Sequence, residues 1–316
     1  MVSRHVPILT VTPNPALDVS TSTAVVEAEH KLRCGVTRLD PGGGGVNVSR
    51  VVRNLGGRPL AVYAVGGPTG DAYRNLLEDE GVAGLAVRIA ESTRESFTVD
   101  ETSTGRQFRF VLQGPSLTEA EWIALFDAVG GELPGPGFVV ASGSLPPGVP
   151  DDFYARLARL ARDNGARCVV DTSGDALRAA LDEGVYLIKP SKRELGELVG
   201  DRIDDDGELI EASRELVGAG RCEVVALSLG GDGAIVVSAD QALRLPTPKV
   251  EVRSTVGAGD SFLAALLLRI AEGHDLGEAL RAGVAAGSAT AALPATALVG
   301  ADDLARLAEG LVPESI

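Results

Sequence analysis

Short apolar runs alternate with amphipathic stretches along most of this 316-residue chain. Runs such as VPILTVT (residues 6–12) and GFVVASGS (residues 137–144) predict buried strands, because a strand covered on both faces needs few polar positions. Stretches such as VNVSRVVRNLGG (residues 46–57) place apolar residues at helical spacing and end at glycine, which predicts helices. The repeated strand–helix units predict an α/β fold: a doubly wound, mostly parallel sheet flanked by helices, with ligands at the carboxyl ends of the strands.

Two segments, at about residues 18–40 and 91–112, do not follow this alternation. Both are rich in Thr, Ser and Val, a composition typical of strands, and both carry basic residues. They predict either a small sheet that projects from the main body or ordinary edge strands. No linker, repeat or low-complexity run divides the chain, so we expect one domain over residues 1–316.

Composition argues against several classes of protein. A formal net charge of −15 disfavours binding to nucleic acid or to anionic membrane lipid, which attract basic surfaces. No apolar run is long enough to span a bilayer and no secretory leader is evident, so we expect a cytoplasmic location. The three cysteines lie far apart and indicate neither a disulfide framework nor a zinc site. With three histidines and no metalloprotease, serine-hydrolase or P-loop motif, proton transfer in an enzyme would fall to a carboxylate.

The segment STVGAGDSF (residues 254–262) places small residues and an acid where an extended run meets an apolar helix. Gly257, Ala258 and Gly259 would leave backbone N–H groups unobstructed at the helix N-terminus, which is a ready site for an anion. Asp260 would lie in or just before the first turn, where the helix dipole favours its ionised form. An acid beside an anion site suits proton removal during phosphoryl transfer, and the alternative is a helix N-cap.

Other loops at predicted strand ends also carry candidate ligand-binding groups. DPGGGGVNVSR (residues 40–50) has four glycines before a helix start, which lets the backbone lie against a ligand. TPNPALD (residues 12–18) ends a strand with Asn14 and Asp18, and the Asp18 carboxylate could accept hydrogen bonds from sugar hydroxyls or serve only in a turn. LSLGGDGA (residues 227–234) ends another strand and could equally be a hairpin turn.

Five motifs occur in this order along the chain: DPGGGGVNVSR, ASGSLPPGV, IKPSKREL, LSLGGDGA and STVGAGDSF. Together they resemble the PfkB carbohydrate kinases of the ribokinase-like superfamily, over nearly the whole chain. The resemblance implies a doubly wound core with a β-sheet lid, and the lid of such kinases often forms a dimer interface. It also implies phosphoryl transfer from ATP, with Mg²⁺, to a hydroxyl of a small sugar phosphate.

Within that family, KLRC followed shortly by four plain glycines is most similar to the minor, PfkB-type 6-phosphofructokinases. The resemblance therefore implies fructose 6-phosphate as the acceptor and fructose 1,6-bisphosphate as the product. A 1-phosphofructokinase, which typically has a lysine in the glycine motif, or a tagatose-6-phosphate kinase is an alternative. More distant alternatives are a neutral-sugar or nucleoside kinase and a non-catalytic sensor of nucleotide or sugar, which would need no acid beside the anion site.

The resemblance also assigns roles to individual residues. It implies that the general base is Asp260 and that the anion hole is formed by Gly257, Ala258 and Gly259. It implies that the sugar is bound by Asp18, Gly43, Gly44, Gly45, Asn47 and Gly143, and that the sugar's existing phosphate is bound by Lys31, Arg94 and Arg109. It implies that the nucleotide is bound by Lys189, Ser191, Ser228, Gly230, Gly233, Thr255, Gly257, Gly287 and Ser288.

Two regions depart from the family pattern around the metals. Ser191 stands where the family usually has asparagine, three residues before Glu194, the acid that the resemblance links to Mg²⁺ through water. Near the C-terminus, AALPATALVG lacks the polar and basic residues that relatives place around a monovalent-cation loop. Backbone carbonyls near Ser254 and Val256 are still candidate ligands for K⁺.

Overall fold

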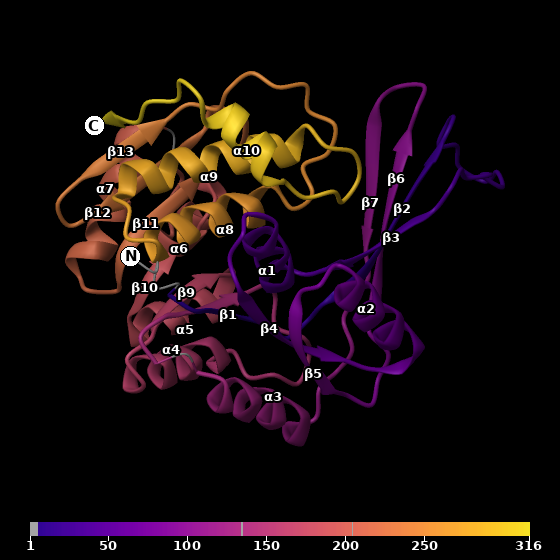
Figure 1. Cartoon of the computed structure of the whole chain (residues 1–316), viewed down its shortest axis with the longest axis horizontal. Coiled ribbons are helices and arrows are strands. Elements are labelled where there is room, and N and C mark those ends of the chain that lie inside the picture. Colours follow the sequence, from indigo (N-terminus) through magenta and orange to yellow (C-terminus); the bar gives the residue numbers. More distant parts are fainter. Residues whose placement is uncertain (1–5, 134, 204) are drawn as a thin grey trace.

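The structure is a computed structural model that describes residues 6–133, 135–203 and 205–316. Ten strands of these residues form one large sheet: β1 (Ile8–Thr12), β4 (Pro59–Val65), β5 (Ala83–Arg88), β8 (Phe138–Ser142), β9 (Arg167–Asp171), β10 (Val185–Ile188), β11 (Cys222–Ser228), β12 (Ala234–Ser238), β13 (Ala242–Leu245) and β14 (Glu314–Ser315). Their order is β14-β13-β12-β11-β10-β9-β8-β1-β4-β5 (Figure 1). The strands from β11 to β5 run parallel, and β12, β13 and β14 extend the sheet antiparallel. The predicted α/β fold with a mostly parallel sheet is therefore confirmed.

Helices cover both faces of the large sheet (Figure 1). They are α1 (Gly44–Asn54), α2 (Gly67–Asp79), α3 (Glu119–Gly131), α4 (Phe153–Asp163), α5 (Gly174–Glu183), α6 (Lys192–Val199), α7 (Asp206–Gly218), α8 (Ala258–Ala271), α9 (Leu276–Ala291) and α10 (Ala301–Ala308). Successive residues of β8 serve opposite faces: Val139 packs with apolar residues of α3 to α7, while Val140 packs with those of α1, α8, α9 and α10. This two-sided burial explains why the strands read as continuous apolar runs.

The two segments that broke the alternation form a second, smaller sheet, which we call the lid. Its strands are β2 (Ala16–Thr23), β3 (Arg38–Gly42), β6 (Arg94–Glu101) and β7 (Arg106–Val111). Their order is β3-β2-β6-β7, with β2 and β6 parallel and the other two pairs antiparallel. The lid stands beside the main body at the right of Figure 1. The projecting sheet is therefore the correct alternative, rather than edge strands of the main sheet.

Several elements carry a weaker pattern in the sequence than the runs above. Residues 83–88 form the edge strand β5, whose side chains are mostly part-exposed, so no continuous apolar run marks it. Residues 119–131 form α3, which begins with a capping box between Thr118 and Glu121, a signal that could have identified this helix. The turn at residues 229–233 joins β11 to the antiparallel β12 through a short 3₁₀ helix (Gly230–Asp232), as the hairpin alternative required.

Within the part of the chain described, no helix is long and apolar enough to cross a membrane.

Candidate active site

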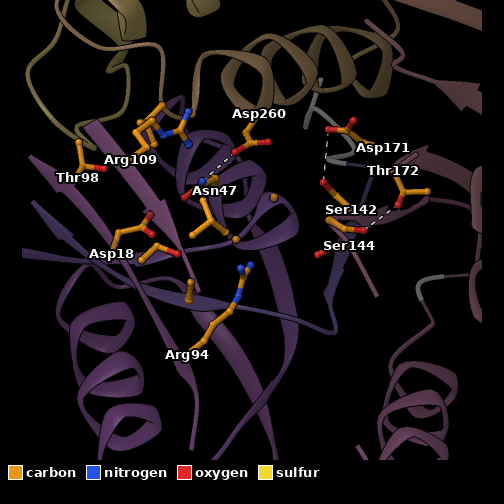
Figure 2. A pocket seen from close by; sticks show the side chains of 18 of the residues that line it. Asp18, Asn47, Arg94, Thr98, Arg109, Ser142, Ser144, Asp171, Thr172 and Asp260 are labelled. Atoms are coloured by element: carbon orange, nitrogen blue, oxygen red, sulfur yellow. Dashed lines mark hydrogen bonds between the residues drawn. The ribbon is translucent and has the colours of Figure 1, made fainter. Parts of the chain in front are cut away.

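The first candidate site is a cavity of about 360 Å³, which we call the lid cavity. It lies between the inner face of the lid, the carboxyl ends of β8 and β9, and the N-termini of α1 and α8. Figure 2 shows Asp18, Asn47, Arg94, Arg109 and Asp260 arranged around it. The cavity therefore opens at the carboxyl ends of parallel strands, where the sequence predicted that ligands bind.

Asp260 is the acid on the α8 side of the lid cavity. Its carboxylate accepts a 2.8 Å hydrogen bond from Nδ2 of Asn47, 213 residues earlier in the chain (Figure 2). Burial, with a further contribution from Asp171, raises the pKa of Asp260 to about 6, while Asn47, Lys189 and Arg109 act in the opposite direction. A carboxylate with a pKa just below neutrality is ionised at neutral pH and still able to take a proton, as a general base must.

The N-terminus of α8 has the geometry of an anion site. Its N-cap is Gly257, in the left-handed region at φ 74°, a conformation that a side chain would strain. Asp260 is the third residue of the helix rather than its cap. Among the described residues the N–H of Ala258 makes a long hydrogen bond to the oxygen of Thr255, at 3.4 Å, so the N–H groups of Gly257 and Gly259 are the ones most open to a ligand.

The glycine run before α1 brings backbone close to the carboxyl end of β8. A Cβ atom on Gly44 would lie 2.2 Å from Oγ of Ser142, so any side chain there would force the Ser142 hydroxyl to move. Gly43, Gly44 and Gly143 line the lid cavity, whereas Gly45 packs against the backbone of β1, where a Cβ would lie 2.7 Å from the Val11 oxygen. Gly45 therefore has a packing role that the sequence alone did not separate from ligand binding.

Asp18 and two arginines form the lid side of the cavity. Burial raises the pKa of Asp18 to about 7, although the nearby cations Arg50, Arg94 and Arg109 act in the opposite direction. Arg94 donates from Nη1 to the oxygen of Leu112 and from Nη2 to the oxygen of Asn14, and its buried Nε has no hydrogen-bond partner among the described residues. A group that is positively charged, in part unsatisfied, and turned into a cavity is suited to hold an anion.

A second cavity, of about 300 Å³, lies beside α8 and α9; we call it the α8–α9 cavity. It is lined by six of the residues predicted for the nucleotide: Ser228, Gly230, Gly233, Thr255, Gly287 and Ser288. Ala258 and Gly259 line this cavity, while Gly257 and Asp260 line the lid cavity. The first turn of α8 therefore separates the two cavities, with its acid facing the lid.

Asp171, which the sequence analysis did not single out, also lines the lid cavity. It ends β9, and its Oδ1 lies 3.1 Å from Nζ of the buried Lys189. A Cβ on Gly259 would lie 3.4 Å from the same Nζ, which places the ammonium group beside the first turn of α8. The apolar run before DTSG marked a strand end, which is the signal that could have identified Asp171.

Comparison with known proteins matches the pfkB family carbohydrate kinase to residues 16–299. The chain belongs to this family of kinases. It is 45% identical over 302 residues to the ATP-dependent 6-phosphofructokinase isozyme 2 of Mycobacterium tuberculosis, covering 96% of this chain and 89% of that protein. A 1-phosphofructokinase of Bacillus subtilis is 33% identical, covering 90% of this chain and 92% of that protein.

A solved structure of Escherichia coli phosphofructokinase-2 in complex with substrates and products superposes with a TM-score of 0.93 at 40% identity, covering 96% of this chain and 98% of that one. The same E. coli enzyme has also been solved in complex with potassium and as a tetrameric inhibited form. The resemblance to the pfkB family and the ribokinase-like fold class are confirmed, and kinases of this family transfer phosphoryl groups to a hydroxyl of a sugar.

The segment predicted to contact Mg²⁺ forms a capping box. Ser191 is the N-cap of α6, and its N–H and Oγ–H both donate to Oε2 of Glu194, at 2.9 and 2.8 Å. The other oxygen, Oε1, lies 3.9 Å from Nη2 of Arg193, and Glu194 lines the lid cavity. No group of three or more His, Cys, Asp or Glu side chains within the described residues could hold a metal ion on its own.

The two residues named for K⁺ lie on the irregular loop before α8. Ser254 is buried, its N–H donates to the oxygen of Ala291, and its Oγ accepts from the N–H of Val256 at 3.3 Å. Val256 also lines the lid cavity. The loop therefore lies against the end of α9, next to the anion site.

Lys31 lies apart from the two arginines with which it was grouped. It is an exposed residue of the segment between β2 and β3, and it is not among the described residues that line the lid cavity. Within one chain, only Arg94 and Arg109 of the three predicted phosphate-binding cations reach the cavity.

Proposed function

We propose that this chain transfers the γ-phosphoryl group of ATP to the 1-hydroxyl of fructose 6-phosphate, giving fructose 1,6-bisphosphate. The observation that carries the proposal is the first turn of α8, which lies between two cavities and turns Asp260 toward the lid. The sugar phosphate would occupy the lid cavity and ATP the α8–α9 cavity. The phosphoryl group would then cross at the exposed N–H groups of the helix.

Each side of the lid cavity suits one end of the acceptor. Arg94 and Arg109 on the lid would hold the phosphate that the sugar already carries, as charge-assisted bonds. Asp18 and Asn47 would bind ring hydroxyls. Asp260 would remove the proton of the attacking hydroxyl, and the N–H groups at residues 257–259 would stabilise the negative charge of the transferred group.

Mg²⁺ bound with ATP would supply charge neutralisation for the phosphates. The residues present fit it: Glu194 is a carboxylate, the ligand type that Mg²⁺ prefers, and it keeps Oε1 outside the capping box. A contact through water is the role we propose for it. K⁺ held by carbonyls near Ser254 and Val256 is a further proposal, as is a cytoplasmic location.

The magnesium role can be tested with two substitutions. Glu194→Gln should raise the Mg²⁺ concentration for half activity by roughly tenfold, because removing an outer partner of a metal typically costs 10–100-fold in affinity. Ser191→Asn should lower that concentration, since an amide reaches further than a hydroxyl while still capping α6. Titration of activity against Mg²⁺ at saturating ATP measures both.

Glu197→Gln is the matched control for the magnesium titration. Glu197 is an exposed acid on the same helix, paired with Arg193. Its substitution should leave the Mg²⁺ dependence unchanged. If Glu194→Gln behaves like this control, the metal is held without help from α6.

The choice of acceptor is tested by competition between two fructose phosphates. With the existing phosphate held by the lid, fructose 6-phosphate presents its carbon-1 hydroxyl to Asp260, whereas fructose 1-phosphate must bind reversed. We expect kcat/KM for fructose 6-phosphate to be higher by about tenfold, a difference of about 1.4 kcal/mol in transition-state stabilisation. Equal concentrations of both, with limiting ATP, give the ratio from their relative rates of loss.

The outcome of that competition separates the alternatives. Faster loss of fructose 1-phosphate would identify the chain as a 1-phosphofructokinase. Tagatose 6-phosphate differs at one hydroxyl and should compete more closely, so it belongs in the same assay. Phosphorylation of free fructose, ribose or adenosine in preference to all three would instead indicate a neutral-sugar or nucleoside kinase.

A homodimer formed through the lid is also part of the proposal. Large apolar side chains are exposed on the lid and on the segments that flank its strands, among them Leu39, Phe110 and Leu112. An exposed apolar surface of this kind favours association. Because Lys31 does not line the cavity of its own chain, its predicted contact with the sugar's phosphate depends on a second copy.

A further inference from the structure

The amide of Asn47 is held on both sides by groups of fixed hydrogen-bonding character. Its Nδ2 donates to Oδ2 of Asp260 at 2.8 Å, and its Oδ1 accepts from Nη1 of Arg50 at 3.3 Å. Asn47 and Arg50 are three residues apart on α1, so their side chains share one face of the helix. Arg50 does not line the lid cavity, and the sequence analysis gave it no role.

Arg50 is itself held by a buried network. Its side chain is only 5% exposed. Nε and Nη2 donate to the two oxygens of Glu80, at 2.6 Å each; Nη2 also donates to Asp40 at 3.5 Å, and Nη1 to the oxygen of Pro41 at 3.1 Å. With the bond to Asn47, these five contacts use all five N–H groups of the guanidinium. The group therefore has one orientation in which everything is satisfied.

The network also connects separate parts of the fold. Glu80 follows α2, whereas Asp40 lies on lid strand β3. Asp40 further accepts two hydrogen bonds from Arg38 and one from the hydroxyl of Thr296, in the segment after α9. The position of Arg50 is thus fixed from α2, from the lid and from the C-terminal part of the chain.

A guanidinium can only donate, and this decides which way the Asn47 amide faces. With its oxygen toward Arg50, the amide presents its N–H to Asp260. If the amide turned over, its N–H would face the N–H of Arg50 and its oxygen would face the Asp260 carboxylate. Both contacts would be repulsive, and the carboxylate would lose a donor that stabilises its ionised form.

We propose that Arg50 is a positioning residue for phosphoryl transfer: it fixes the Asn47 amide so that Nδ2 donates to Asp260. The proposal rests on the role proposed above for Asp260 as the base. The other charged groups that act on Asp260 are Asp171, Lys189 and Arg109, from β9, from the segment after β10 and from β7. Asp18 and Glu194 line the same cavity. Arg50 does not act on Asp260 directly, and of the other groups named here it acts on Asp18, whose pKa it lowers. Arg50→Lys keeps that positive charge, so its effect on Asp260 should act through Asn47.

The test is the pH dependence of kcat/KM for fructose 6-phosphate. In Arg50→Lys, a single ammonium group cannot serve Glu80, Asp40 and Asn47 together. Without the fixed amide, the rising limb of the profile should move to higher pH by about one unit. Activity should then fall about tenfold on the acidic limb and recover at alkaline pH, while KM for ATP stays unchanged.

Two further variants separate positioning from general loss of structure. Asn47→Ala should show the same shift, and adding Arg50→Lys to it should shift the limb no further, because both changes remove one interaction. Glu80→Gln breaks the ion pair between Glu80 and Arg50 but leaves Arg50 beside Asn47. The rising limb of the pH profile of this variant should therefore stay at the wild-type pH. Thermal unfolding of each variant is measured in parallel. If Arg50→Lys does not fold, Arg50→Gln carries the same expectation for Asn47. Because it also removes a charge that lowers the pKa of Asp18, it is measured alone and together with Asn47→Ala, and only a shift that Asn47→Ala already shows is assigned to the amide.

Each contrary outcome has one meaning. A limb that stays in place in Arg50→Lys and Arg50→Gln, with activity reduced equally at every pH, overturns the positioning role. Additive shifts in the double variant also overturn it, since Arg50 would then act by another route. Retention of turnover by Asp260→Asn would instead contradict the proposed function itself, so the two failures are distinguishable.

Discussion

Asp260→Asn should lower kcat for fructose 6-phosphate by at least about 100-fold, the lower end for loss of a positioned general base. The amide keeps the shape of the carboxylate, and its oxygen can still accept the hydrogen bond from Asn47. Binding of ATP should change little, because the α8–α9 cavity is lined by Ala258 and Gly259 rather than by Asp260. Steady-state kinetics with both substrates varied measures the two effects separately.

The pH dependence gives a second measure of the same group. Because the pKa of Asp260 is raised to about 6, kcat/KM of the wild type should rise with pH through about 6 and then level off. In the folded chain this carboxyl holds its proton to higher pH than in the unfolded chain, so it contributes stability below about pH 4 that is lost as pH rises through 6. The asparagine variant escapes this loss and should be more stable than the wild type at pH 8.

The size of that stabilisation follows from the same shift. A change in pKa of about two units corresponds to up to roughly 3 kcal/mol, reduced to the extent that cavity water solvates the partly exposed carboxylate. Denaturant unfolding at pH 4 and pH 8 measures it, and Asp275→Asn at the N-cap of α9 is the control.

In the kinetic experiment, an Asp260→Asn protein that keeps most of its turnover would show that this residue is not part of the mechanism.

Arg109→Ala should raise KM for fructose 6-phosphate by roughly 10- to 150-fold, the equivalent of one charge-assisted bond of about 1.5–3 kcal/mol. Arg109 lies on β7 opposite Thr98 and turns into the lid cavity. It is a cleaner choice than Arg94, whose bonds to Leu112 and Asn14 also tie the lid to the main body. Initial rates against sugar phosphate and against ATP give the two KM values.

Arg106→Ala provides the matched control for Arg109→Ala. Arg106 lies on the same strand, but it pairs with Glu101 and lies over the ring of Phe108, outside both cavities. Its loss should leave KM for fructose 6-phosphate near the wild-type value. An equal rise in both KM values for Arg109→Ala would indicate a general disturbance of the lid rather than a lost phosphate contact.

The main fold could be predicted because its strands are buried on both faces. Continuous apolar runs such as residues 137–144 have no other simple explanation between amphipathic helices, so the order of elements followed directly. The edge strand β5 could not be found in this way, since its part-exposed side chains carry no such run. The lid was found because its polar, basic strands have one face turned to solvent or ligand.

The candidate site divides in a similar way. Residues at strand ends and helix starts, such as Asp18 and Asp260, are marked by local sequence, because glycine and the change of pattern point to them. Contacts between distant segments leave no such mark. The bond from Asn47 to Asp260 joins residues 213 apart, and the network around Arg50 joins α1, α2, the lid and Thr296. No local sequence pattern indicates either of these contacts.

The two cavities that meet at α8 are built from different stretches of the chain. The lid cavity takes its lid wall from residues 16–18 and 94–111, whereas the α8–α9 cavity lies wholly within residues 228–291. With the sugar phosphate in the lid cavity and ATP in the α8–α9 cavity, as proposed, a substitution on the lid should alter which acceptor is bound without changing the walls around the phosphoryl donor. The acid and the helix turn between them stay common to both. With the occupancy proposed above, acceptor choice and donor choice are set by separate segments of one chain, so substitutions can change the first while the acid and the donor cavity stay the same.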